Sequence, residues 1–118
     1  MDRGAAMYES QKAGKPIFVK EEESLADALT GGIGLDNKYT FELTKELVDD
    51  FVLVSEKEIA GGIYHAYWHE SQIVEGAGAV AIASLLNNKF SPKGPSLALL
   101  CGRNINMEKH FNLISAKK

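Results

Sequence analysis

Apolar residues recur every three or four positions in several stretches of the chain, and this spacing predicts amphipathic helices. The clearest case is residues 55–69, where Ser55 and Glu58 form a capping-box pattern in front of apolar residues at helical spacing. Gly14 is suited to end a first helix in a left-handed conformation, and Asn106 can cap the last one. We therefore expect helices over residues 4–13, 40–50 and 55–69. A fourth helix should begin at the "EGAGA" turn (75–79) and end before the "SPKGP" stretch (91–95), and a fifth should begin at residue 106.

Three other stretches have the composition of β-strands. They are "PIFVK" (16–20), the β-branched run "FVLVS" (51–55) and "SLALLC" (96–101), whose uninterrupted apolar run suits a strand covered on both faces. Strands that alternate with helices indicate an α/β fold, here a three-layer αβα arrangement with a mainly parallel sheet. The length of 118 residues allows one domain or a piece of one, so residues 1–118 are treated as a single segment.

Composition and charge limit the classes of partner that are expected to bind this protein. Hydrophobic residues make up 45% and charged residues 25%, and the net charge of -3 gives no electrostatic reason to expect nucleic acid. No apolar run approaches the roughly 20 residues that a bilayer span requires. The single Cys101 cannot form an internal disulfide, and the chain does not start with a signal-peptide pattern. We therefore expect a soluble, cytoplasmic protein without a membrane or nucleic-acid partner.

The stretch "VEGAGAVA" (74–81) is a glycine-rich turn that opens a helix. Gly76, Gly78 and Ala81 satisfy the loose dinucleotide-binding fingerprint, in which glycines let the backbone approach a pyrophosphate. The context is poor, because a full strand is missing before the turn and no acidic residue follows at the end of the next strand. Small residues that simply let the helix pack tightly are the favoured alternative.

Taken together, "SLADALTGGIGLDN", "TFELTKELVDDFVLVSEKEIAGG", "IVEGAGAVAIASLL" and "LLCGRNI" resemble, in order and spacing, the pyridoxal-phosphate enzymes of fold type II. The resemblance is closest to the serine/threonine dehydratases. The stretch "IAGGIYHAYWHESQIVEGAGAVAIASLL" is particularly similar to the dehydratases of hydroxyectoine utilisation.

This resemblance implies that the chain is the C-terminal third of a pyridoxal-phosphate-dependent lyase that deaminates a hydroxy amino acid by α,β-elimination. In such enzymes the Schiff-base lysine and the glycine-rich loop for the cofactor phosphate lie upstream of the region that resembles this chain. We therefore expect no catalytic residue in this segment, and no activity from the chain alone. Because strands such as "LALLC" need covering on both faces, we expect the isolated chain, if soluble, to be marginally stable or to associate with itself. The complete enzyme is expected to be a homo-oligomer.

The resemblance also assigns cofactor-binding residues. Cys101, followed by Gly102, matches the position whose side chain, more usually serine, hydrogen-bonds the pyridine nitrogen. A cysteine is a weaker donor than serine, and a buried structural thiol is the alternative. Glu75 would lie near the face of the cofactor ring, or it would simply be a first-turn carboxylate stabilised by the helix dipole. Both roles can hold together.

Substrate-side residues follow from the segment that corresponds to "ADG" in the family. Asp27 and Ala28 match it, with Ala28, expected near the cofactor, in place of the glycine. Asp27 is expected near the substrate, although capping or solvation would be the better explanation without the resemblance. Gly31 stands where related enzymes offer a hydroxyl to the substrate, which implies a different or roomier pocket.

No metal site is expected. His65 and His69 are four residues apart on one helix, but no third ligand is identifiable, so surface or packing roles are favoured. Related enzymes can bind a divalent cation at positions that match Gly4 and Ala6, and an alanine cannot supply the carboxylate.

Two other functions stay open at this point. The chain could be a truncated, non-catalytic binding or interaction module of the same fold. Binding of a nucleotide at residues 76–81 is the third hypothesis. An upstream reading frame with the lysine and the phosphate loop would favour the enzyme, whereas saturable binding of NAD or ATP would favour the nucleotide site.

Overall fold

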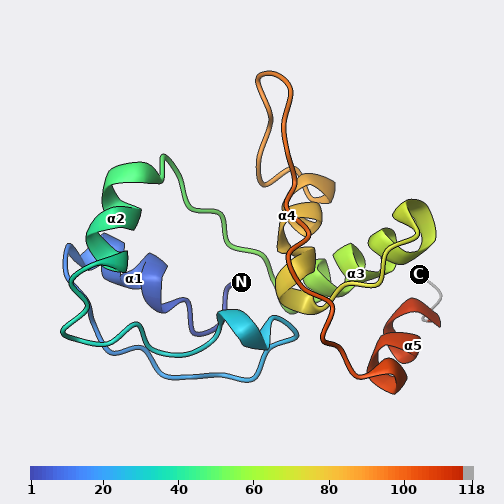
Figure 1. Ribbon diagram of the computed structural model, residues 1–118, viewed down its shortest axis with the longest axis horizontal. Helices are drawn as coiled ribbons and strands as arrows, with labels where there is room; N and C mark the ends of the chain where they lie inside the picture. The colour runs from blue at the N-terminus through green and yellow to red at the C-terminus, as the bar shows by residue number, and fades with distance from the viewer. Residues whose placement is uncertain (116–118) are drawn as a thin grey trace.

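The computed structural model describes residues 1–115, in which five α-helices and one 3-10 turn form (Figure 1). They are α1 (Ala6–Ala13), η1 (Asp27–Leu29), α2 (Thr40–Leu47), α3 (Glu56–Glu70), α4 (Gly76–Leu86) and α5 (Met107–Ser115). Helix α1 packs on α2, while α3 packs on both α4 and α5. Long connecting segments join these two helical groups, and η1 reaches across to α4.

Every helix that the apolar spacing predicts is present. Gly14 ends α1 with a φ of 70°, and both hydrogen bonds of the Ser55–Glu58 capping box form at the start of α3. The Asn106 side chain accepts a hydrogen bond from the Lys109 amide at 3.0 Å, which caps α5. The predicted helix over 40–50 is shorter than expected, since the backbone turns extended at Val48.

The predicted strands do not form among residues 1–115. Residues 16–20, 51–55 and 96–101 have no strand assignment, and Figure 1 draws them as unpaired loops. A strand needs a neighbour with which to exchange backbone hydrogen bonds, and these three segments do not provide that for one another. The sheet layer of the expected αβα arrangement is therefore absent from the described residues. Apolar side chains of the predicted strands are consequently exposed, and Leu97 is 93% and Phe18 is 82% accessible to solvent.

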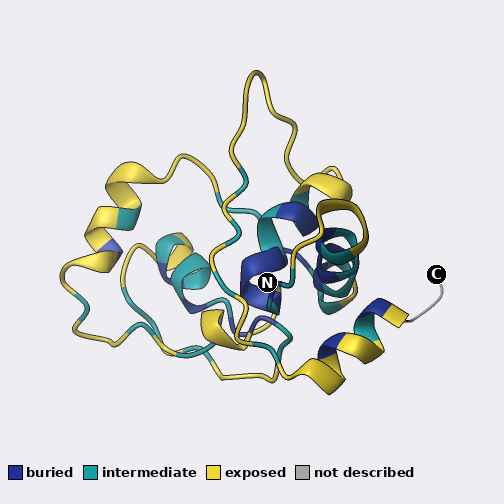
Figure 2. Ribbon diagram, turned by 45° about the vertical axis from the view of Figure 1, so that its right-hand side comes forward, coloured by how far each residue is buried: buried dark blue, intermediate teal, exposed yellow. Residues whose placement is uncertain are grey.

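The core lies where α3 crosses α4 and α5 (Figure 2). It is built from small and branched apolar residues: Met1, Ala26, Val54, Ile59, Ile63, Ala66, Val74, Ala77, Ala79, Ile82, Ala83 and Ile114. Gly62 lets the two main helices approach closely, because a Cβ there would lie 2.8 Å from the Ala79 carbonyl oxygen. The Trp68 indole N–H donates to the Ile114 carbonyl at 3.0 Å and ties α5 to α3.

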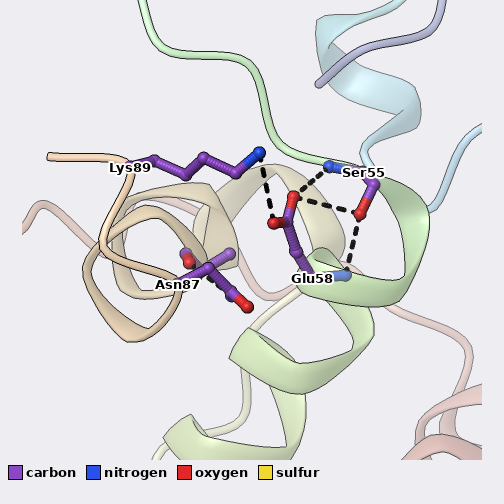
Figure 3. Close-up of polar contacts among 5 residues, drawn as sticks. Ser55, Glu58, Asn87 and Lys89 are labelled. Atoms are coloured by element: carbon purple, nitrogen blue, oxygen red, sulfur yellow. Dashed lines mark hydrogen bonds and ion pairs between the residues drawn. The ribbon is translucent and has the colours of Figure 1, made fainter.

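A polar network joins the start of α3 to the segment after α4 (Figure 3). The Glu58 carboxylate accepts hydrogen bonds from the Ser55 amide at 2.7 Å and from the Ser55 hydroxyl at 3.0 Å, and it lies 3.3 Å from the Lys89 ammonium. The Ser55 backbone N–H, more than any other group, lowers the pKa of Glu58 from its usual 4.5. This network fixes α3 and α4 at the end of the crossing where α3 begins.

Candidate functional site

The glycine-rich turn at 75–79 opens α4, as the sequence predicts. Glu75 is the N-cap residue, with an extended backbone, and the four residues after it are buried. A Cβ on Gly76 would lie 2.0 Å from the Leu25 carbonyl oxygen and 2.7 Å from the Ala26 nitrogen. The backbone of Leu25 and Ala26 is therefore in direct contact with the start of α4, and only glycine fits at position 76.

The segment that follows Cys101 lies on the same turn. A Cβ on Gly78 would be 2.7 Å from the Gly102 carbonyl oxygen. The Glu75 amide donates to that oxygen at 3.1 Å, and the Asn104 amide donates to the Glu75 carboxylate at 2.8 Å. Three segments far apart in the sequence, 24–28, 75–79 and 101–104, thus meet at the N-terminus of α4.

These contacts decide between two interpretations of the glycines. The space that a side chain would occupy at Gly76 and Gly78 is filled by protein backbone, from Leu25 and Gly102. A phosphate would need that space for its own approach. The packing explanation is therefore favoured over the dinucleotide fingerprint.

Cys101 is exposed in this chain. A depression of about 270 Å³ borders it, lined by residues 72–74 and 100–103. Glu75 is half-buried, and its side chain covers Gly102 so closely that a Cβ there would lie within 2.2 Å of a carboxylate oxygen. Glu75 makes no side-chain cap hydrogen bond, so its carboxylate holds the 102–104 backbone instead. Glu75 and the residues that follow Cys101 are therefore held together where their two segments meet.

The predicted substrate-side residues lie in and after η1. The Asp27 side chain is exposed and accepts a hydrogen bond from the Ala28 amide at 2.9 Å. The Asp27 carbonyl accepts from both the amide and the hydroxyl of Thr30, at 3.0 and 2.7 Å. Gly31 has a φ of 104°, a conformation that L-residues rarely adopt. The backbone requirement is thus a second reason for glycine at this position, beside the roomier pocket expected from the sequence.

Sequence reasoning missed one residue that holds this segment, Glu56. Its carboxylate accepts hydrogen bonds from the Leu25 amide at 2.8 Å and from the Ser24 hydroxyl. The capping-box pattern drew attention to Glu58, two residues further along. No local pattern connects Glu56 with residues that lie 31 and 32 positions away.

The two histidines of α3 pack together away from this turn. Their rings stack with centroids 4.6 Å apart, and His65 Nε2 lies 3.4 Å from a carboxylate oxygen of Glu70. Within residues 1–115, no group of three or more His, Cys, Asp or Glu side chains is arranged to hold a metal ion. None of the helices in that range is long and apolar enough to cross a bilayer.

Known proteins match the chain along nearly its whole length. Residues 1–102 match the family described as "Pyridoxal-phosphate dependent enzyme". A Sinorhizobium fredii protein named "Putative threonine dehydratase" is 56% identical over 116 residues, which cover 98% of this chain and 35% of that protein. An L-threonine ammonia-lyase of Thermotoga maritima is 36% identical over 111 residues, covering 93% of this chain and 27% of the enzyme. The chain thus spans about a quarter to a third of the length of these relatives.

A solved structure, that of maize serine racemase, matches with a TM-score of 0.79 and 24% sequence identity. The match covers 94% of this chain and 35% of the racemase chain. At this identity the likeness shows the fold, and with the family match it supports the fold type II architecture that the sequence predicts. Pyridoxal phosphate is the cofactor of the matched family. The chain therefore belongs to the family of pyridoxal-phosphate-dependent enzymes.

Proposed function

We propose that this chain is the C-terminal part of the catalytic domain of a pyridoxal-phosphate-dependent dehydratase. The complete enzyme would remove water and ammonia from a hydroxy amino acid such as serine or threonine by α,β-elimination. One observation carries the proposal: the segments 24–28, 75–79 and 101–104 meet at the start of α4. They contain Asp27, Glu75 and Cys101, which the family resemblance assigns to substrate and cofactor.

The residues present fit one edge of the cofactor. Cys101 would offer its exposed thiol to the pyridine nitrogen, with Gly102 next to it at the ring edge. The space that a side chain would take at Gly102 holds the Glu75 carboxylate, which would bring Glu75 to the same edge. The start of α4 does not fit the cofactor phosphate, because backbone fills the space beside Gly76 and Gly78. When bound, the cofactor supplies the electron sink for the elimination. A neutral partner for its nitrogen keeps that sink moderate, which suits loss of a β-hydroxyl.

The remaining assignments belong to the same proposal. Ala28 would approach the cofactor through its backbone, while Asp27 and Gly31 would border the substrate. Glu75 would orient the ring while its carboxylate holds the Asn104 amide. The chain alone would be inactive, and the complete enzyme would be a cytoplasmic homo-oligomer. Its subgroup would be the dehydratases of hydroxyectoine utilisation.

The test replaces Cys101 in the complete enzyme. Cys101→Ser is expected to preserve elimination, because the hydroxyl is a neutral partner of similar size. Cys101→Asp is expected to favour a protonated pyridine nitrogen, to change the absorbance of the bound cofactor, and to slow elimination relative to transamination. Both rates and the spectrum are measured with the cofactor saturating. An Asp variant that behaves like the wild type would show that Cys101 does not face the ring nitrogen.

The alternative, a non-catalytic module of the same fold, makes a different prediction. In that case no reading frame with a lysine-bearing segment and a phosphate loop would precede the encoded chain. Ammonia release from serine or threonine by the complete protein, above a blank without protein, would exclude this alternative.

A further inference from the structure

We propose that Glu56 is a positioning residue for the active site, and this inference rests on the proposed function. Glu56 is the first residue of α3 and does not belong to any of the segments that the sequence assigns to the site. Its half-buried carboxylate accepts two hydrogen bonds from the segment that precedes η1: one from the Leu25 amide at 2.8 Å, and one from the Ser24 hydroxyl. Both carboxylate oxygens are used.

The Ser24 hydroxyl extends this anchor by one residue. While it donates to Glu56, its oxygen accepts from the Ala26 amide at 3.0 Å. Two consecutive amides therefore depend on Glu56. The Leu25 amide donates to Glu56 itself, and the Ala26 amide donates to the Ser24 hydroxyl that Glu56 holds. Backbone donors that cannot reach water need such partners, and Ala26 is completely buried.

The anchored residues lead directly into the predicted substrate side. The Ala26 carbonyl accepts from the Leu29 amide at 2.9 Å, and the Asp27 carbonyl accepts from the Thr30 amide at 3.0 Å, which closes η1. On the other side, the Leu25 carbonyl is pressed against Gly76. Glu56 thus fixes the point from which the Asp27–Ala28 turn starts, and it does so relative to α4, which carries Glu75.

A carboxylate fits this geometry, because two donors converge on one side chain and each reaches its own acceptor oxygen. A glutamine keeps one acceptor oxygen for the Leu25 amide, whereas its N–H can only donate to the Ser24 oxygen. The Ser24 hydroxyl hydrogen then loses its acceptor on residue 56. The negative charge also strengthens both bonds and is favoured at the N-terminus of a helix. A site residue held within a fraction of an ångström keeps the substrate in its reactive orientation, so loosening this anchor is expected to reduce catalysis.

The experiment compares Glu56→Gln with Glu58→Gln in the complete enzyme. Both changes remove one carboxylate from the first turn of α3, but Glu58 bonds to Ser55 and Lys89 and not to the 24–28 segment. Glu58→Gln therefore controls for any general loss of stability. Amide hydrogen exchange is measured without substrate, together with the dissociation constant for pyridoxal phosphate and with KM and kcat for serine and threonine.

For Glu56→Gln we expect exchange at Leu25 and Ala26 to rise on the order of tenfold, and KM to rise or kcat to fall by a similar factor. The amides in the middle of α3 should keep their protection. Glu58→Gln should leave the exchange at residues 25–30, the cofactor affinity and the kinetics unchanged. Should Glu56→Gln not fold, Ser24→Ala removes only the hydroxyl bridge and should produce the same pattern at Ala26 with a smaller amplitude.

Unchanged exchange at residues 25–30 in Glu56→Gln overturns the proposal, and so does raised exchange with cofactor affinity and kinetics like those of the wild type. A wild-type enzyme that eliminates neither serine nor threonine contradicts the proposed function instead. In that case exchange and cofactor affinity still decide the role of Glu56.

Discussion

Gly76→Ala should push the 24–28 segment away from the start of α4. The new Cβ would lie 2.0 Å from the Leu25 carbonyl oxygen, 2.2 Å from its carbon and 2.7 Å from the Ala26 nitrogen. All three are backbone atoms, so no side chain can rotate out of the way. Since ordinary contacts of this kind begin near 3.4 Å, the 24–28 segment would have to move away by about 1.4 Å.

The free energy of unfolding should fall by about 3 kcal/mol, at the upper end of the range for overpacked sites. Alanine usually gains up to about 1 kcal/mol over glycine inside a helix, but position 76 is the first residue of α4 and gains less. Gly78→Ala meets a milder obstacle, 2.7 Å from the Gly102 carbonyl oxygen, and should lose about 1 to 2 kcal/mol. Gly32→Ala meets nothing within 4 Å and should change stability by less than about 0.5 kcal/mol.

The assay is chemical unfolding of the complete enzyme, followed by circular dichroism, with cofactor affinity measured on each folded variant. Gly32→Ala is the control for the substitution itself. The expected order of destabilisation is Gly76, then Gly78, then Gly32. If Gly76→Ala is as stable as Gly32→Ala and binds the cofactor like the wild type, the backbone contact at the start of α4 does not exist, and the reasoning is wrong.

Two more predictions concern the frame around the site. Glu58→Gln should destabilise the protein by about 1 kcal/mol at neutral pH, the usual value of a capping interaction. Because the folded state lowers the pKa of Glu58, this contribution is complete above the usual 4.5 and is lost as the pH falls through the lowered pKa. Unfolding curves of both proteins should therefore converge in acid, and a constant difference would contradict this. Trp68→Phe should remove the hydrogen bond to the Ile114 carbonyl and lower the free energy of unfolding by about 1 kcal/mol. Amide exchange in α5 should be faster in the variant than in the wild type, whereas exchange in α4 should change less. Equal exchange in α5 of both proteins would count against that role.

The helices could be predicted because their signals are local. The Ser55–Glu58 capping box and the left-handed Gly14 depend on neighbours within a few residues, and both form as expected. The three predicted strands are not formed among residues 1–115, because a strand depends on a partner that can lie anywhere in the sequence. The apolar composition of residues 96–101 indicates that the segment is suited to a buried strand, but it does not identify a partner strand. Within residues 1–115 the segment is not paired.

The site shows the same division. Glycine spacing predicted a close approach at Gly76 and Gly78, but only the structure identifies Leu25 and Gly102 as the approaching backbone. Resemblance to a family pointed to Cys101 and Asp27. The Glu56 anchor had no sequence signal, because its hydrogen bonds join residues more than 30 positions apart.

The contact between backbone atoms at the start of α4 has a consequence for how such an enzyme can change. The frame of the site is made from main-chain atoms, two glycines and two carboxylates, whereas the side chains of Cys101, Asp27 and Ala28 are exposed and carry little of the fold. Substitutions at these three positions are therefore expected to leave this scaffold folded. In the proposed enzyme, selection would act on these positions through chemistry and not through stability.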